Sequence, residues 1–328
     1  MIMKRLISNF LILILSIISI LLVGEIVFRI YAKFQYNVPF IFSHAVKQED
    51  SEFGWPGKKI FGDRDSNKYK IFFIGDSFTH GLGISEDKMY YNLIKDKLSI
   101  EVFIYGGAGY GTLQEYMVLD KYFDQLKPDL IIIQLCTNDF VNNLWELENA
   151  SLFNINYMVR PYLINGEIVY RCPFNMGEGR LLLLAHSKLV YSIFVEIAKL
   201  ELMLAKMGFL YTVEQDINKR GLEFDDFRKS VSVTKSLFLK IKNRTGKTPV
   251  VFFLEHDAQP YLDAFRRICS DNNIELIDSL PEALRKAEDS GAHVWLNKPK
   301  GDFHWGVAGH QICADVLIEE LTKKGYIK

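Results

Sequence analysis

The sequence predicts an α/β fold with a parallel sheet, preceded by an N-terminal membrane-spanning helix. Short apolar runs alternate with helical patterns from residue 69 onward, which is typical of strands and crossover helices in a parallel sheet. Ahead of them, residues 6–23 carry no charge. About 20 apolar residues match the hydrocarbon thickness of a bilayer.

The N-terminal segment is predicted to be an uncleaved signal anchor. A cleaved signal peptide has a shorter apolar core, followed by small residues at the cleavage site. Here the flank is Glu25-Ile26-Val27-Phe28-Arg29, which offers no such site. Lys4 and Arg5 favour a cytoplasmic N-terminus, although Arg29 and Lys33 oppose them. A short tail ahead of a large domain favours export of that domain.

Four regions follow from this organisation. We expect a cytoplasmic tail at residues 1–5, a transmembrane signal anchor at 6–28, a polar stalk at 29–68 and a catalytic domain at 69–328. Within the domain the alternation breaks between about 140 and 247. An insertion that shapes or caps a site is the preferred interpretation, and a purely structural helical layer is the alternative.

Five apolar runs are predicted as strands: Lys70–Ile74, Val102–Tyr105, Leu130–Leu135, Val250–Leu254 and Glu275–Ile277. The third is apolar almost throughout, as expected of a central parallel strand that is buried on both faces. Helical patterns predict helices near Lys88–Leu98, Leu113–Leu126, Ser187–Met207, Phe224–Asn243, Tyr261–Asn272 and Ala308–Lys324.

Composition excludes several classes of function. Lys and Arg (39) nearly balance Asp and Glu (40), for a formal charge of -1, so the basic surface of a nucleic-acid binder is missing. The cysteines form no C-x-x-C pair and no histidines cluster at ligand spacing, so a structural zinc site is not expected. Nothing else in the sequence implies a metal or an organic cofactor. Buried free thiols are predicted at Cys136, Cys269 and Cys313, with a Cys269–Cys313 bridge as an alternative, and Cys172 is the fourth cysteine.

Polar residues or glycines follow three of the predicted strands. Ser77 comes directly after the first strand, Gly106 after the second and Asn138 after the third. Asp302 and His304 stand just ahead of the last helix. Because sites in open α/β sheets lie outside the carboxyl ends of the strands, we expect these residues to share one site.

Together these residues supply the parts of an acyl-transfer site. A serine hydroxyl is a poor nucleophile until a base such as His304 takes its proton, and Asp302 can orient the imidazole. The backbone N–H groups of Ser77 and Gly106 and the amide of Asn138 could stabilise the oxyanion of a tetrahedral intermediate.

The blocks resemble those of the SGNH/GDSL hydrolase superfamily, most specifically in Gly75-Asp76-Ser77-Phe78-Thr79-His80-Gly81. The resemblance covers residues 69–328 apart from the insertion. It implies a flavodoxin-like three-layer αβα sandwich with a five-stranded parallel sheet. It also implies Ser77 as nucleophile, His304 as base with Asp302 beside it, and an oxyanion hole formed by Ser77, Gly106 and Asn138.

The sequence departs from the family pattern at three positions. Cys136 stands where the third block often begins with Gly, and Ile104 stands where the second block often has Asn. The acid commonly lies three residues before the histidine, where this chain has Gly301. Asp302 instead fits the Asp-x-His-Trp variant.

Other roles are open for several of these residues. Ser77 could simply cap the following helix. Asp76 is interpreted as a structural hydrogen-bonding residue and Asp139 as a residue that shapes its loop. His80 is at best a pocket residue, and His310 belongs to the start of the last helix.

The predicted function is a serine esterase that removes acyl groups, foremost acetyl, from an extracytoplasmic glycan or lipid. Acyl transfer to a sugar hydroxyl uses the same residues, so an O-acetyltransferase acting on a cell-envelope polysaccharide is the first alternative. A catalytically silent, membrane-anchored glycan-binding protein is the second.

Overall fold

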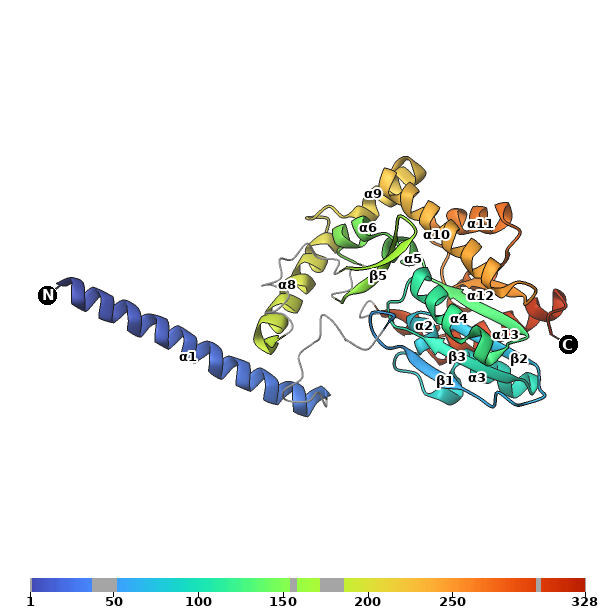
Figure 1. The fold of residues 1–328 in the computed structure, drawn as a ribbon, viewed down its shortest axis with the longest axis horizontal. Coiled ribbons are helices and arrows are strands. Elements are labelled where there is room, and N and C mark those ends of the chain that lie inside the picture. Colours follow the sequence, from blue (N-terminus) through green and yellow to red (C-terminus); the bar gives the residue numbers. More distant parts are fainter. Residues whose placement is uncertain (1, 37–51, 154–157, 172–185, 299–301, 328) are drawn as a thin grey trace.

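The computed structural model describes residues 2–36, 52–153, 158–171, 186–298 and 302–327 (Figure 1). The five predicted strands are present as β2 (Lys70–Gly75), β3 (Glu101–Gly106), β4 (Leu130–Leu135), β7 (Val250–Leu254) and β8 (Glu275–Ile277). They pair in parallel in the order β3-β2-β4-β7-β8, which is the flavodoxin-like order. The predicted fold class is confirmed.

Two hydrophobic cores lie on the two faces of this sheet. Successive side chains of a strand point to opposite faces, so Phe72 and Ile74 enter one core and Ile71 and Phe73 the other. The first core is covered by α4 (Thr112–Leu126), α10 (Asp225–Thr245) and α11 (Tyr261–Asp271). The second is covered by α3 (Tyr90–Leu98), α12 (Leu280–Asp289) and α13 (Val307–Lys323).

A sixth strand, β1 (Lys58–Phe61), pairs antiparallel with the edge of β3. It lies in the range 29–68 that was predicted as a stalk, and Phe53 and Trp55 just ahead of it are buried in the first core. The stalk prediction therefore fails for this part of the segment. The strand begins with two lysines and has exposed positions, so it lacks the apolar run by which the other strands were found.

The N-terminal helix α1 (Ile2–Tyr36) is longer than the predicted anchor at 6–28. Its segment Arg5–Tyr31 is apolar and long enough to cross a membrane, and none of it is buried in the structure. Membrane insertion itself stays a prediction.

In the described residues of the predicted insertion, two short helices, a hairpin and two further helices come before α10. These are α5 (Asp139–Asn142), α6 (Trp145–Ala150), β5 (Arg160–Ile164) with β6 (Glu167–Arg171), α8 (Lys188–Lys206) and α9 (Val213–Arg220). The helix α10 packs against α4 and the sheet. It is therefore the crossover between β4 and β7, and the insertion ends before the predicted residue 247.

The cysteines Cys136, Cys269 and Cys313 are free and buried, as the preferred interpretation held. The alternative of a Cys269–Cys313 bridge is wrong. Cys172 lies outside the described residues.

Candidate active site

Ser77 is the first residue of α2 (Ser77–His80), a single helical turn directly after β2. The cap of this turn is Asp76, whose Oδ1 accepts a hydrogen bond of 2.9 Å from the backbone N–H of Phe78. Asp76 is fully buried. Because Asp76 is the N-cap residue of this turn, the hydroxyl of Ser77 does not serve as the cap and is available for other contacts. The capping hypothesis for Ser77 is wrong.

The hydroxyl of Ser77 meets the imidazole of His304. Their Oγ and Nε2 atoms lie 2.9 Å apart, although the residues are 227 positions apart in the sequence. A serine and a histidine within hydrogen-bond distance are the pair that general-base activation of a nucleophile requires.

His304 is held by β10 (Asp302–Trp305), which pairs antiparallel with β9 (Trp295–Asn297). The next residue, Trp305, is buried, and its ring lies 4.6 Å from that of Phe78. The ring of Phe78 also lies 5.1 Å from that of His304. The residue after the serine and the residue after the histidine thus pack together and hold the pair in contact.

Asp302 lies on β10, with its backbone paired with Asn297. Its side chain is outside the described part of the structure, so its role beside His304 stays a prediction. Burial raises the pKa of Asp76, and the hydrogen bond from Phe78 and the charge of His304 offset this only in part. Asp76 is therefore a structural cap, as the sequence indicated.

Gly106 ends β3 and lies against the helical turn that carries Ser77. A Cβ atom at this position would lie 2.4 Å from the backbone N of His80, so only glycine permits the approach. The ring Nδ1 of His80 lies 3.1 Å from the carbonyl oxygen of Gly106, and burial lowers the pKa of His80. These contacts direct His80 to β3 and give it a structural role.

Asn138 follows β4 and precedes α5. Its Nδ2 donates a 3.0 Å hydrogen bond to Oδ1 of Asn142, one helical turn later. A side-chain amide has two N–H donors, so the second remains for an oxyanion. The amide also borders a cleft of about 390 Å³ lined by Thr137, Asn138, Phe153, Thr212, Glu214, Gln215, Asn218, Ala258, Gln259 and Tyr261.

A cluster of buried carboxyl groups lies below the ends of these strands. Oε1 of Glu255, at the end of β7, accepts hydrogen bonds from Sγ of Cys136 at 2.9 Å and from the backbone N of Thr137 at 3.2 Å. Burial raises the pKa of Glu255 to about 8. Burial and neighbouring carboxylates likewise raise the pKa values of Asp139 and Glu115 well above their usual range. Through its hydrogen bonds to Cys136 and Thr137, Glu255 supports the loop that carries Asn138.

Arg160 on β5 connects the insertion to the glycine-rich loop after β3. Its Nε lies 2.7 Å from Oε2 of Glu148, and both side chains are buried. Its Nη2 donates a 2.7 Å hydrogen bond to the carbonyl oxygen of Gly109. The guanidinium also lies 4.8 Å from the ring of Trp55. Sequence reasoning missed this residue and Glu255. The signal for Glu255 was an ionisable residue directly after an apolar strand.

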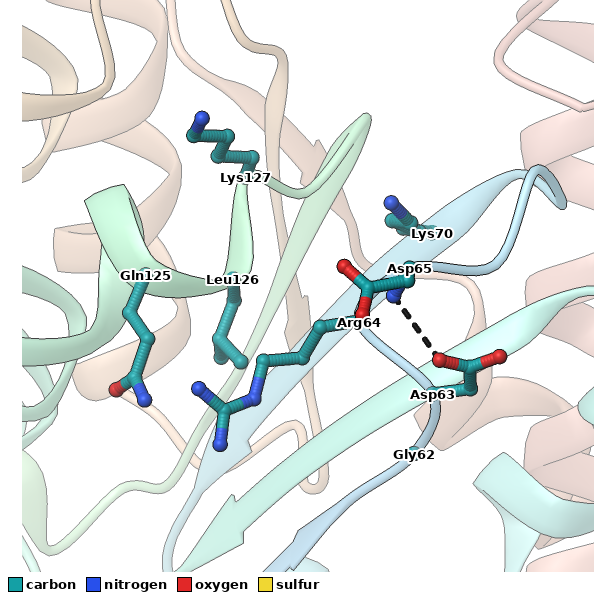
Figure 2. A pocket seen from close by; sticks show the side chains of 8 residues that line it. All are labelled: Gly62, Asp63, Arg64, Asp65, Lys70, Gln125, Leu126 and Lys127. Carbon is teal, nitrogen blue, oxygen red and sulfur yellow. Dashed lines mark hydrogen bonds between the residues drawn. The ribbon is translucent and has the colours of Figure 1, made fainter.

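A larger hollow of about 550 Å³ lies at the start of β2, at the opposite end of the strand from Ser77 (Figure 2). It is lined by Gly62, Asp63, Arg64, Asp65, Lys70, Gln125, Leu126 and Lys127. These residues include no nucleophile paired with a base, so the site at Ser77 is the candidate for catalysis.

A family model described as GDSL-like lipase/acylhydrolase matches residues 71–176 of the chain. Over this segment the chain is similar to GDSL-like lipases and acylhydrolases. The match includes Ser77, Gly106 and Asn138, and it ends ahead of Asp302 and His304. The match supports an enzyme that hydrolyses ester bonds.

Solved structures similar to this chain include three hydrolase-type proteins. A lipolytic protein of the G-D-S-L family from Veillonella parvula is 12% identical with a TM-score of 0.42, covering 77% of this chain and 98% of its own. A lipase/acylhydrolase from Enterococcus faecalis is 15% identical with a TM-score of 0.43, covering 79% and 97%. The esterase EstA from Pseudoalteromonas is 13% identical with a TM-score of 0.41, covering 77% and 97%. No curated protein sequence matches the chain.

Proposed function

We propose that the chain is a membrane-anchored serine esterase that removes acyl groups, foremost acetyl, from an extracytoplasmic glycan. The observation that carries the proposal is the 2.9 Å contact between Oγ of Ser77 and Nε2 of His304. The pair lies at the carboxyl end of a parallel sheet, where ligands of such sheets bind.

In the proposed mechanism, His304 takes the hydroxyl proton of Ser77 as the oxygen attacks the acyl carbon. The negative charge that develops on the carbonyl oxygen is stabilised by the backbone N–H groups of Ser77 and Gly106 and by the amide of Asn138. Collapse of the intermediate breaks the ester bond, and His304 returns the proton to the departing alcohol. A water molecule then hydrolyses the acyl-enzyme by the same steps, with Asp302 orienting the imidazole throughout.

The chemistry of the cleft beside Asn138 favours a sugar over a lipid chain. The cleft presents the side-chain amides of Gln215, Asn218 and Gln259, which can donate and accept hydrogen bonds. Phe153 and Tyr261 add aromatic surface. Neutral hydrogen-bonding groups next to aromatic rings suit the hydroxyl groups and apolar faces of a glycan.

Contacts between α1 and α8 support an anchor that is retained and not cleaved. The carboxylate of Glu25 accepts hydrogen bonds from Oγ of Ser187 and from the backbone N–H groups of Lys188 and Leu189. Removal of α1 would take this acceptor away from the backbone N–H groups of Lys188 and Leu189, and leave only the cap by Ser187 at Val190. A retained helix is what a signal anchor requires.

The proposal is tested with the purified full chain and an acetylated oligosaccharide, with acetate release as the readout. Ser77→Ala should abolish release, and Asp302→Asn should lower kcat by up to about 10⁴-fold. The exposed Asp289→Asn serves as the control for the second variant. Added unacetylated oligosaccharide shows whether the acetyl group is transferred to water or to a sugar hydroxyl. Acetate alone supports the esterase, whereas a newly acetylated sugar supports the O-acetyltransferase. Full release by Ser77→Ala would contradict both.

A further inference from the structure

The helix α8 exposes an apolar stripe, interrupted on the same side of the helix by Glu196, which is exposed and forms an ion pair with Lys199. Ile193, Ile197, Leu200, Met203 and Met207 recur every three or four residues, and each is about half exposed or more (51%, 50%, 51%, 49% and 62%). Residues at this spacing lie on one side of a helix. Phe209 and Tyr211, directly after the helix, extend the apolar surface with two exposed aromatic rings.

This stripe is not the face by which α8 packs on the protein. Ala205 is buried, and Tyr191, Phe194 and Leu202, on the same side of the helix as Ala205, are half-buried. The helix therefore has a second apolar face that nothing covers in the part of the chain that the structure describes. An exposed second apolar face on a helix indicates an interaction site.

The start of α8 is fixed at the end of the apolar segment of α1. Glu25 caps the helix through Ser187, Lys188 and Leu189. Arg29 forms an ion pair of 2.6 Å with Glu25 and donates a 2.6 Å hydrogen bond to the carbonyl oxygen of His186. Both charged residues lie within the segment Arg5–Tyr31 that is long enough to span a membrane. The first turn of α8 therefore lies at the depth where α1 leaves the bilayer.

The direction of α8 completes the geometry. Figure 1 shows α8 running across the direction of α1 and not alongside it. A helix that starts at the membrane boundary and runs across a spanning helix lies along the membrane surface. An amphipathic helix in this position buries its apolar face in the boundary between headgroups and acyl chains.

We propose that α8 is an interfacial membrane helix whose stripe, Ile193 to Met207, lies in the outer layer of the bilayer. The stripe is covered by bilayer lipid and not by another protein. The proposal rests on the membrane anchor stated under the proposed function. Since α8 has 19 residues, it spans about 28 Å at 1.5 Å per residue. It leads directly to α9, whose Gln215 and Asn218 line the cleft beside Asn138. The cleft is thereby held close to the membrane surface, where a lipid-linked or membrane-proximal glycan is within reach.

The test places a nitroxide label on α8 of the full chain in phosphatidylcholine–phosphatidylglycerol vesicles. Single cysteines replace Ile197 and Leu200 on the stripe and Lys206 on the polar side, in a Cys172→Ser background. The three other cysteines are buried. Oxygen concentrates in lipid, and a water-soluble nickel chelate stays outside. We expect the ratio of oxygen to nickel accessibility to be several-fold higher at Ile197→Cys and Leu200→Cys than at Lys206→Cys.

Two results would overturn the inference. Equal, high nickel accessibility at all three positions would place the stripe in water. Shielding of the two stripe positions from both reagents would mean that protein, such as a second copy of the chain, covers the stripe. Carbonate extraction separates this failure from that of the anchor. A chain that stays in the vesicles but shows either result refutes the interfacial helix alone, whereas a chain that is extracted refutes the anchor as well. Neither readout depends on esterase activity.

Discussion

At the scale of single residues, the sequence identified the polar positions at the strand ends but not the groups beneath them. Ser77 and His304 were chosen from motif and position, and the structure brings them into contact. Glu115 and Glu255 were not chosen, because a carboxyl group within an apolar or helical pattern carries no sign of its neighbours. Their cluster forms only when β4, β7 and α4 come together.

The amide of Asn138 gives a prediction for the rate of the chemical step. Asn138→Ala removes one oxyanion donor, for which losses of about 10²–10³ in kcat are typical. The donor acts on charge that develops in the transition state, so KM should change little. Steady-state kinetics on a p-nitrophenyl ester measures both. Asn243→Ala, on an exposed position of α10, is the control. A loss in kcat below about tenfold would mean that backbone N–H groups form the hole without Asn138.

Glu255 gives a prediction for stability as a function of pH. Burial raises its pKa from 4.5 to about 8 in the folded chain. Between these values the unfolded chain releases the proton and the folded chain keeps it. The carboxyl group therefore stabilises the fold fully below pH 4.5, and that contribution is lost as the pH rises toward 8. The slope from this group is at most about 1.4 kcal/mol per pH unit.

The variant Glu255→Gln keeps a similar shape and cannot titrate. Its free energy of unfolding should fall less steeply between pH 4.5 and 8 than that of the wild type, so the variant gains relative stability with rising pH. Denaturant unfolding of the full chain in detergent across this range measures the slopes. Glu319→Gln on the surface of α13 should leave the slope unchanged. Parallel curves for wild type and Glu255→Gln would show that Glu255 is ionised in the fold.

At the scale of elements, a strand could be predicted from the sequence only where both of its faces are buried. The five central strands read as apolar runs because both of their faces are covered. The edge strand β1 and the hairpin β5–β6 have exposed positions and gave no such run. The hairpin did carry a signal, since Asn165-Gly166 forms its turn with φ angles of 51° and 87°. Asn-Gly is the pair that such turns favour. The alternation of apolar and polar residues on either side of it was too weak to predict the two strands.

The ion pair on β5 gives a prediction at this scale. Arg160→Met removes the ion-pair partner of the buried Glu148, and breaking a buried ion pair typically costs about 3–5 kcal/mol. It also frees the carbonyl of Gly109 and loosens the loop next to Gly106, so kcat should fall together with Tm. Arg171→Met is the matched control, because Arg171 is exposed and pairs with Arg160 across the hairpin. A Tm for Arg160→Met equal to that of the control would show that the ion pair between Arg160 and Glu148 contributes nothing to the stability of the fold.

At the scale of the whole molecule, α1 and the catalytic domain lie at opposite ends of the structure (Figure 1). The composition of α1 indicated a membrane span, whereas its contact with α8 could not be foreseen. Glu25 and Ser187 are 162 positions apart and bond through side chains that carry no motif. Long-range pairs of this kind depend on the complete fold.

The topology of the molecule is a prediction in its own right. If α1 is an uncleaved signal anchor, a C-terminal reporter that is active only outside the cytoplasm should be active on the full chain. The mature protein should also keep its N-terminal residues, as determined by mass spectrometry. A reporter active only in the cytoplasm would contradict the orientation. A soluble form that begins after residue 24 would contradict the anchor.

The central claim is that Ser77 is a nucleophile activated by His304. A fluorophosphonate tests it most directly, because it forms a covalent adduct with an activated serine and not with an ordinary one. We expect one adduct per chain, located by peptide mass spectrometry on Ser77, with slow labelling in His304→Ala. We expect no adduct in Ser77→Ala, which should also lose ester hydrolysis by about 10³-fold or more. An adduct on another residue, or full hydrolysis by Ser77→Ala, would contradict the claim.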